Sequence, residues 1–341
     1  MSMNHSRHHG PKKSHADGAV HVEGNRFVAS DGVSIFYRTC CPRAWSACPA
    51  RTVVLLHGVP LSSESLECLI EDLCKAGLRV VAPDLRGFGL SGTPPTDAGF
   101  AIERYLRDID ELLALLRLGA VTLGGHSFGG FLAQRYAALN PGRVPELVLI
   151  ASSPRFLPGD DFAFPISPAL LEAGGPFLAA NNLPGFLGVF VPAALPETCP
   201  GVEEARRVAT CIGLQSGGGS TRAITGVFGA LAVPGQGDNR PLLASIRART
   251  LIVAGSLDVV APPGASIVLR QGIADSSLVE LPNRGHFFFL TARHRLSQLV
   301  LEFLCNASRC RCDICRPHAA INGASHKRAR RCDGGHRHKK H

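Results

Sequence analysis

Short apolar segments alternate with amphipathic segments along most of this chain, and that alternation constrains the fold more than any other feature. The run Thr52-Val-Val-Leu-Leu56 has the length and composition of a strand that is buried on both faces. Residues 65–76 follow it, with their apolar side chains on one helical face and Gly77 as a stop signal. Because repeated strand–helix units place their strands parallel, we predict an α/β fold: a doubly wound, mostly parallel sheet with helices on both faces.

The same periodicities predict further elements along the chain. An Asp31-Gly32 dipeptide between the first two apolar segments predicts a hairpin turn. The predicted strands are 22–30, 33–39, 52–56, 79–82, 121–123, 147–151, 250–254 and 277–281. The predicted helices are 65–76, 102–119, 128–139, 264–270 and 293–304.

The alternation stops after Ser153 and resumes near residue 246. The intervening residues are rich in Pro, Gly and Phe and show no strand pattern, so we expect an inserted, largely helical segment. After Cys305 the apolar periodicity ends. We therefore divide the chain into a disordered basic, His-rich segment (1–20), a first core part (21–153), the insertion (154–245), a second core part (246–305) and a disordered basic, Cys/His-rich tail (306–341).

The formal net charge of +9 belongs to the two ends of the chain. Residues 1–20 carry +2 and residues 306–341 carry +8, whereas residues 21–305 carry −1. A near-neutral body lacks the electrostatic footprint of a nucleic-acid-binding domain. We therefore predict that the body binds no nucleic acid, and that the tail, with His326-Lys-Arg-Ala-Arg-Arg331, could contact acidic partners or act as a nuclear signal.

The cysteines and the first residues bear on location. The twelve cysteines form no regular framework, and Cys74 falls in a predicted helix, where a free cysteine behaves as a small hydrophobe. Residues 1–13 are polar and contain no apolar signal-peptide segment. No apolar run reaches the roughly 18–20 residues of a membrane-spanning helix. These observations predict a cytoplasmic, reducing location and no membrane span, with the oligomeric state left open.

The tail also contains residues of the types that bind zinc. They are Cys310, Cys312, Cys315, His318 and Cys332. Their spacing lacks a paired Cys-x-x-Cys framework and no apolar residues support them, so we predict a disordered tail without metal, with a zinc knuckle as the alternative.

Gly125-His126-Ser127-Phe128-Gly129 lies between a predicted strand and a predicted helix. A serine at the apex of such a turn needs a strained backbone, and the positions two before and two after it have no room for a side chain. The turn points the serine Oγ out above the sheet at a helix N-terminus, where developing negative charge is favoured. We therefore predict that Ser127 is a nucleophile and that His126 points away from its Oγ.

A serine nucleophile needs a base, and the base needs an acid that orients it. His286 follows the last predicted strand, and Asp258 follows the strand before it, so both stand at the carboxyl edge of the sheet. Ser152 and Ser153 occupy the other possible position for the acid and offer no carboxylate there, while Asp275 precedes its strand. Ser127, Asp258 and His286 are thus the predicted catalytic residues.

The segment His57-Gly58-Val59-Pro60 follows the strand 52–56. A tight turn there can aim the backbone N–H of Val59 at the same point as the N–H of Phe128. These two groups are the predicted oxyanion-hole donors.

With these motifs in place, residues 21–305 resemble an α/β-hydrolase with an inserted cap. Asp84-Leu-Arg-Gly-Phe-Gly-Leu-Ser-Gly92 resembles the family's loop after the next strand, and Asp238-Asn-Arg-Pro-Leu-Leu-Ala-Ser-Ile246 resembles its return from the cap. The resemblance implies the triad Ser127, Asp258 and His286, oxyanion donors Val59 and Phe128, and no metal or organic cofactor. It implies that Asp84 and Arg86 shape a loop and take no part in the chemistry.

Departures from several subfamilies narrow the expected activity. Epoxide hydrolases and haloalkane dehalogenases use an aspartate nucleophile, whereas position 127 is serine. Prolyl aminopeptidases carry a small residue where this chain has His126, and they need carboxylates for the substrate amine. Four carboxylates are available here, Asp160, Asp161, Glu203 and Glu204. We predict hydrolysis of a carboxylic ester or lactone, with a prolyl aminopeptidase-like amide hydrolase and a non-catalytic receptor or scaffold as alternatives.

The insertion contains several phenylalanines that suggest an apolar acyl or ring pocket. Since most phenylalanines are core residues, we expect two or three of them to face the substrate, a small apolar ester or lactone. The candidates are Phe162, Phe164, Phe177, Phe186, Phe190 and Phe228.

Overall fold

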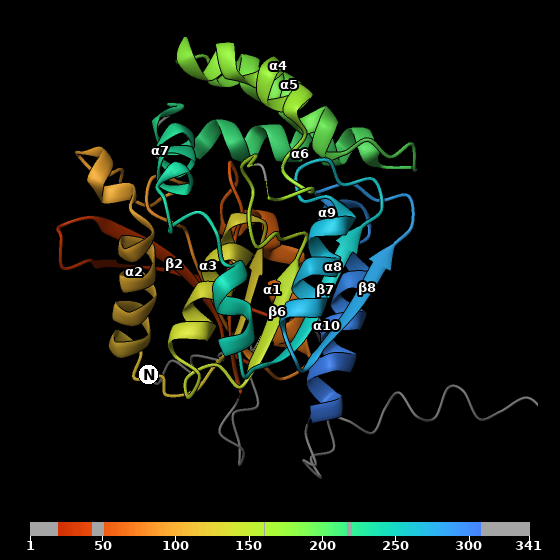
Figure 1. Ribbon diagram of the computed structural model, residues 1–341. Helices are drawn as coiled ribbons and strands as arrows, with labels where there is room; N and C mark the ends of the chain where they lie inside the picture. The colour runs from red at the N-terminus through yellow and green to blue at the C-terminus, as the bar shows by residue number, and fades with distance from the viewer. Residues whose placement is uncertain (1–19, 43–50, 160, 217–219, 308–341) are drawn as a thin grey trace, which may run out of the picture.

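One sheet runs through the centre of the molecule (Figure 1). The structure is a computed structural model that describes residues 20–42, 51–159, 161–216 and 220–307. Within those residues the sheet has eight strands in the order β1-β2-β4-β3-β5-β6-β7-β8. Their bounds are β1 Val22–Val28, β2 Ser34–Cys40, β3 Thr52–Leu56, β4 Arg79–Pro83, β5 Thr122–His126, β6 Glu146–Ile150, β7 Arg249–Gly255 and β8 Ser276–Leu281.

The sheet is antiparallel at one end and parallel over the rest. β1 and β2 form the predicted hairpin, and β2 also pairs with β4 in the antiparallel sense. From β4 to β8 each neighbouring pair is parallel. The predicted α/β fold class with a mostly parallel sheet is thereby confirmed.

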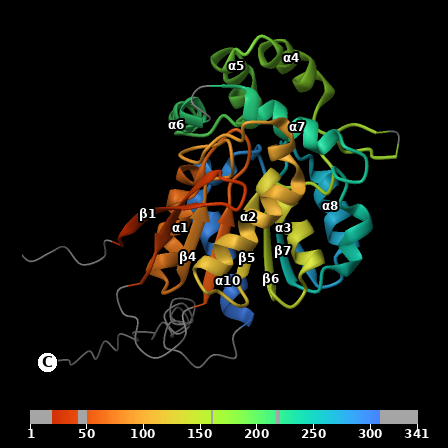
Figure 2. The ribbon, with the colours of Figure 1, turned by 90° about the vertical axis from the view of Figure 1, so that its left-hand side faces the viewer.

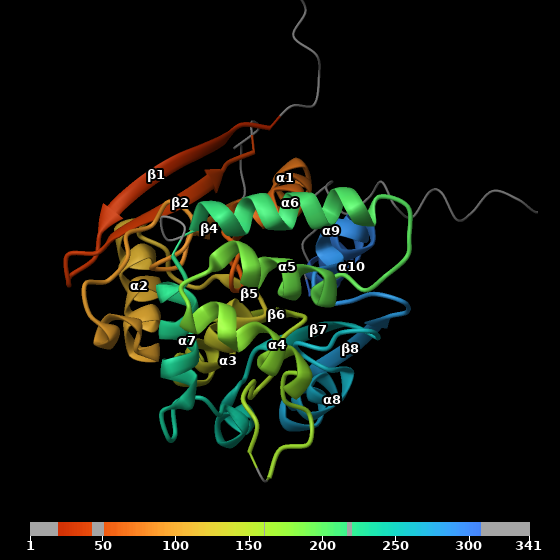
Figure 3. The same ribbon diagram turned by 90° about the horizontal axis from the view of Figure 1, so that it is seen from above.

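Helices cover both faces of this sheet, as Figure 3 shows from above. On one face lie α1 and α10, and on the other lie α2, α3 and α8. Their bounds are α1 Glu67–Lys75, α2 Ile102–Leu115, α3 Phe128–Leu139, α8 Pro263–Gly272 and α10 Arg293–Ala307, with the short α9 Phe288–Thr291 before the last. Short 3-10 helices occupy Ser63–Leu66, Asp97–Phe100 and Arg240–Ser245.

The central strands agree with the sequence pattern, whereas some predicted element ends do not. Every residue of β3, β5 and β6 is buried, as expected for central strands covered on both faces. β5 continues three residues past its predicted end, because Gly124, Gly125 and His126 pair with β6 although glycine is a poor strand former. α10 runs to Ala307, beyond the predicted boundary at 305.

Between β6 and β7 in the sequence, the described residues form four α-helices, which lie over the carboxyl ends of the strands (Figures 1 and 2). They are α4 Pro168–Ala179, α5 Leu183–Ala194, α6 Val202–Gln215 and α7 Arg222–Ala232. The two ends of this insertion meet, since Arg155 and Asp238 form an isolated β-bridge and the Asn239 N–H donates to the Pro154 carbonyl at 2.8 Å. The boundaries 154 and 245 remain a prediction.

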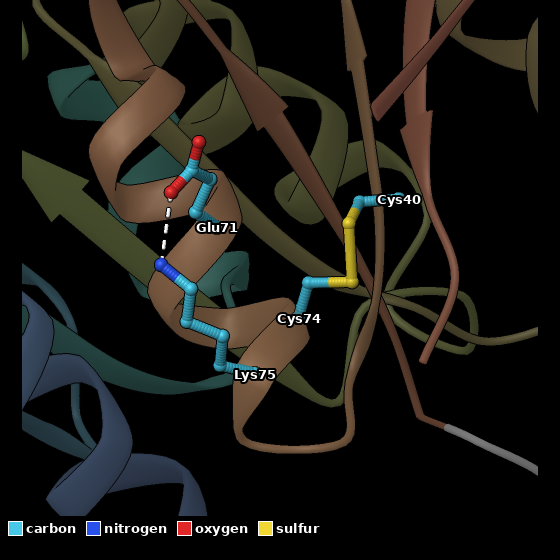
Figure 4. Close-up of a disulfide and its surroundings, with 4 residues drawn as sticks. All are labelled: Cys40, Glu71, Cys74 and Lys75. Atoms are coloured by element: carbon cyan, nitrogen blue, oxygen red, sulfur yellow. Dashed lines mark hydrogen bonds and ion pairs between the residues drawn. A yellow bond between two sulfur atoms is a disulfide. The ribbon is translucent and has the colours of Figure 1, made fainter. Parts of the chain in front are cut away.

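A disulfide joins Cys40, at the end of β2, to Cys74, in the last turn of α1 (Figure 4). Both residues are buried, and Lys75 beside them pairs with Glu71 on the same helix at 2.9 Å. The prediction that Cys74 is a free cysteine is therefore wrong. Thirty-four residues separate the two sulfurs in sequence, and only the packing of α1 near the β2–β4 edge brings them together.

Within the described ranges, the helices are too short or too polar to cross a membrane. The predictions made for residues 1–19 and 308–341, including the tail zinc ligands and the basic run near 326–331, lie outside the described residues.

Candidate active site

Ser127 occupies the turn between β5 and α3, with φ 53° and ψ −122°. This is the sparsely populated, strained backbone expected for a serine at such an apex. A Cβ added at Gly125 would lie 2.4 Å from the carbonyl carbon of Gly129, and one added at Gly129 would lie 2.5 Å from the His57 carbonyl oxygen. Both positions therefore have to be glycine for the turn to close.

The structure brings the three predicted catalytic side chains together. His286, between β8 and α9, has its Nε2 2.8 Å from Ser127 Oγ and its Nδ1 2.8 Å from Asp258 Oδ2. All three residues are buried: Ser127 is 4% exposed, His286 0% and Asp258 3%. The other oxygen of Asp258 accepts the N–H groups of Val260 and Ala261, each at 2.8 Å. The carboxylate is thus held so that Nδ1 carries the proton and Nε2 is left to accept one from serine.

The loop after β3 presses against the serine. A Cβ added at Gly58 would lie 2.7 Å from Ser127 Cβ. Within the described part of the chain, neither the Val59 N–H nor the Phe128 N–H donates a hydrogen bond. These two backbone donors, next to Gly58 and to Ser127 in the chain, are therefore available to an oxyanion.

His57 anchors this loop as a neutral ring. Its Nε2 accepts the Leu85 N–H at 2.8 Å, so the proton sits on Nδ1, which donates to the Gly58 carbonyl at 2.9 Å. Burial lowers the pKa of His57, which keeps this tautomer neutral.

His126 contacts His286 rather than the Ser127 oxygen. Its Nε2 lies 3.1 Å from the His286 carbonyl oxygen, and the two ring centroids are 4.7 Å apart. Burial, followed by the nearby His286, lowers the pKa of His126 well below its usual range, so the neutral ring donates to that carbonyl. This packing against His286 gave no signal in the sequence.

Asp84 and Arg86 have structural partners that match a loop-shaping role. Asp84 accepts the N–H groups of Ser63 and Leu90, each at 2.8 Å. The buried Arg86 guanidinium pairs with Asp31 and Asp108 at 2.7 and 2.6 Å.

Three of the six predicted pocket phenylalanines line one cavity. Phe186, Phe190 and Phe228 border a space of about 330 Å³ between α4, α5 and α7, with a lining that is apolar except for Thr225. Phe162 instead contacts the Arg240 guanidinium and Phe164, and Phe177 covers Gly185. These three do not line the cavity.

Two ring contacts connect the wall of that cavity with His286. The Phe190 ring lies 5.9 Å from the Phe287 ring, and Phe287 follows His286 directly. The Phe287 N–H also donates to the Ala194 carbonyl at the end of α5, at 3.1 Å. Phe287 was missed from sequence, although the run of three phenylalanines after His286 was a signal.

The carboxylates considered for an amine substrate are engaged elsewhere. Asp161 pairs with Arg155 and Arg240, and Glu203 and Glu204 pair with arginines one turn along α6. All three are exposed, and Asp160 lies outside the described residues. Among the described residues no group of three His, Cys, Asp or Glu side chains could hold a metal ion.

Comparison with known proteins finds relatives among hydrolases. Residues 51–184 match the family described as "alpha/beta hydrolase fold". A putative carbamate hydrolase, RutD, of Variovorax paradoxus is 31% identical over 75% of this chain and 92% of its own length. Pimeloyl-[acyl-carrier protein] methyl ester esterase of Chromobacterium violaceum is 29% identical over 74% of this chain and 93% of its own. The solved esterase of Exiguobacterium antarcticum superposes with a TM-score of 0.71 at 27% identity, over 83% of this chain and 99% of that one.

Proposed function

The chain belongs to the α/β-hydrolase fold superfamily and is a hydrolase, and from this premise we propose that it cleaves a carboxylic ester or lactone through an acyl-enzyme on Ser127. One observation carries the proposal: an unbroken series of 2.8 Å contacts runs from Ser127 Oγ through His286 to Asp258. Such a series lets the histidine act as a base and prevents its ring from turning.

The reaction begins when Ser127 Oγ attacks the substrate carbonyl carbon and His286 Nε2 takes the hydroxyl proton. Asp258 stabilises the imidazolium that forms. The carbonyl oxygen becomes an oxyanion, which accepts hydrogen bonds from the Val59 and Phe128 N–H groups. His286 then gives its proton to the leaving alkoxide, and the alcohol departs.

Water completes the cycle. His286 removes a proton from a water molecule, whose oxygen attacks the acyl carbon on Ser127. When the second oxyanion collapses, the proton returns to Ser127 Oγ and the carboxylic acid is released. A lactone follows the same steps, with the alcohol and the acid remaining in one molecule.

We assign the apolar part of the substrate to the 330 Å³ cavity, because its lining residue Phe190 contacts Phe287, which is next to His286 in the chain. Two relatives, an esterase and a putative carbamate hydrolase, have names that state an activity on an acyl bond, and they support ester or carbamate chemistry. The amide alternative has less support, because the carboxylates it needs are paired with arginines on the surface.

The test is a panel of p-nitrophenyl esters, lactones, carbamates and prolyl amides, with the wild type and Ser127→Ala side by side. We expect wild-type turnover of esters or lactones and no turnover by the variant beyond a small residual rate. Turnover of prolyl amides without esters would favour the aminopeptidase alternative. No turnover of any member, with a wild type that is folded, would favour the non-catalytic receptor or scaffold.

Location is a separate proposal. The cytoplasmic location predicted from the sequence conflicts with the Cys40–Cys74 disulfide, because cytosolic thiols are kept reduced. Alkylation of thiols in freshly lysed cells distinguishes the two: modification of both cysteines supports the cytoplasm, and protection supports an oxidising compartment. The basic tail remains our proposed contact for acidic partners, and a tail-deleted chain should lose any salt-sensitive retention on nucleic acid while keeping its activity.

A further inference from the structure

Ser152, the second residue after β6, lies beneath the nucleophile turn. Its Oγ donates a hydrogen bond to the Ser127 carbonyl oxygen at 2.9 Å, and the side chain is fully buried. A Cβ added at Gly130 would lie 2.6 Å from Ser152 Cβ, so the serine is pressed against the first turn of α3. In the sequence this position was notable only for lacking a carboxylate.

The carbonyl that Ser152 holds belongs to the same planar peptide group as the Phe128 N–H. That carbonyl oxygen also accepts the Phe131 N–H at 3.0 Å, and the Ser127 N–H donates to the Ile150 carbonyl at 2.9 Å. Rotation of the 127–128 peptide about its neighbouring bonds would break the two bonds to the Ser127 carbonyl, and the Ser127 N–H bond holds the adjoining 126–127 peptide. The contacts therefore fix the direction of the Phe128 N–H, which is one of the two proposed oxyanion donors.

The backbone of Ser127 needs such support. Its φ of 53° and ψ of −122° belong to a sparsely populated, strained region that persists only where surrounding contacts over-determine it. Of the two donors to the Ser127 carbonyl, the Phe131 N–H is part of the helix itself. Ser152 is the only side chain that holds this carbonyl among the described residues.

A buried series of side chains sets the direction of the Ser152 hydroxyl. Gln134 Nε2 donates to Ser152 Oγ at 3.1 Å, and Asn239 Nδ2 donates to Gln134 Oε1 at 3.4 Å. Arg135 Nε donates to Asn239 Oδ1 at 2.9 Å. Because Ser152 Oγ already accepts from Gln134, its own proton is free to donate onward to Ser127. Every donor in the series points from the guanidinium toward the nucleophile turn, an arrangement in which each bond polarises the next.

We propose that Ser152 is a positioning residue for the oxyanion hole, which acts by holding the 127–128 peptide and is itself oriented by Gln134 and Asn239. The inference rests on the proposed function, because it assigns a role only if Ser127 is the nucleophile. Asn239 belongs to the segment that returns from the inserted helices to β7. The hydrogen-bond series therefore connects this segment with α3 and the nucleophile turn.

Ser152→Ala removes one hydrogen bond from the carbonyl while leaving the Val59 and Phe128 donors in place. Deleting an oxyanion donor outright costs about 10²–10³ in rate, so loosening one should cost about tenfold. We expect kcat and kcat/KM to fall by the same factor with KM unchanged, because the interaction strengthens only in the transition state. The affinity for a trifluoromethyl ketone, which binds as an oxyanion adduct, should fall by that factor as well.

Thr250→Val is the matched control. Thr250 is a buried hydroxyl that also donates to a backbone carbonyl, that of Ala248 at 2.9 Å, at the opposite end of the sheet. Its loss should lower Tm without changing kcat. If Ser152→Ala does not fold, Gln134→Met tests the same series, with a smaller loss expected in kcat and in ketone affinity.

The double variant Ser152→Ala/Gln134→Met should be no slower than Ser152→Ala alone, since both act through one hydroxyl. A folded Ser152→Ala enzyme with wild-type kcat and ketone affinity, and only a lowered Tm, would overturn the proposal. That outcome leaves the proposed function intact, whereas an inactive wild type would overturn the proposed function instead.

Discussion

The loops that carry the triad and the helices inserted above them differ in what borders their glycines. An added Cβ at Gly125 or Gly129 would come within 2.5 Å of backbone atoms in the nucleophile turn. At Gly175 and Gly188, in α4 and α5, an added Cβ would meet nothing within 4 Å, and at Gly185 in α5 it would lie 2.3 Å from a side-chain atom of Phe177. The reaction is therefore assigned to a part of the molecule in which backbone packs on backbone, and substrate choice to a part in which glycines face open space or side chains that can shift.

Polarity differs between the two regions in the same way. The loops hold His57, Asp258 and His286 in specific hydrogen bonds, whereas the cavity between the inserted helices is bordered almost entirely by apolar side chains. Hydrogen-bonded positions depend on atoms placed to a few tenths of an ångström, and apolar pockets depend mainly on volume. Substitutions in the loops should thus change the rate for every substrate, and substitutions around the cavity should change the ranking of substrates.

The largest effect is expected for Asp258→Asn. The amide would present an N–H toward Nδ1 and favour the wrong histidine tautomer, which in a related constellation costs about 10⁴ in kcat. The loss of kcat is measured with the best ester of the panel. The control is Asp275→Asn, at the other end of the sheet. A loss shared by both variants, or absent from Asp258→Asn, would remove Asp258 from the triad.

The disulfide should matter to stability rather than to rate. Cys74→Ala opens a 34-residue loop, and disulfides that close loops of this size typically contribute about 2–4 kcal/mol. We expect a clear fall in Tm with kcat unchanged at temperatures where the variant is folded, and Cys211→Ser, at an exposed cysteine, should have no such effect. Equal Tm values for wild type with and without reductant would contradict the cross-link.

Gly175→Leu tests the cavity directly. Gly175 lines the cavity and has open space beside it, so the leucine fills volume without a clash. We expect kcat/KM for octanoate esters to fall about tenfold relative to acetate esters, since a lost methylene-sized contact is worth about 1–3 kcal/mol. Gly188→Leu adds the same side chain at an exposed glycine of α5 outside the cavity and should leave the ratio unchanged. If both variants rank the esters as wild type does, the acyl group binds elsewhere.

The smallest effect concerns pH. Burial lowers the folded-state pKa of His126 far below the value of about 6.5 in the unfolded chain. Below that pH the unfolded state binds a proton that the folded state excludes, so stability is lost as pH falls, by up to about 1.4 kcal/mol per pH unit. His126→Gln should flatten the fall of Tm between pH 6.5 and 5. The control is His294→Gln, at an exposed helix position, which should leave the slope of Tm against pH unchanged. If His126→Gln also keeps the wild-type slope, the prediction for His126 is wrong.

The tight loops were also the part that could be predicted from sequence. A steric requirement is visible within five residues, because Ser127 stands between Gly125 and Gly129. Asp258 and His286 can be found because each follows a recognisable apolar strand. The cavity could not be predicted in this way, because whether Phe162 or Phe190 faces it depends on how α4, α5 and α7 cross. The Cys40–Cys74 pair and the Ser152 contact depend likewise on packing between distant segments, which leaves no local pattern.

The central claim is that Ser127 is the nucleophile, and covalent labelling tests it most directly. A fluorophosphonate added to the wild-type protein should give one adduct by intact mass, located on Ser127 by peptide mapping. Ser127→Ala should give none, and Ser152→Ala should be labelled more slowly at the same serine. No adduct on a folded wild type, an adduct on another residue, or equal labelling of Ser127→Ala would contradict the account.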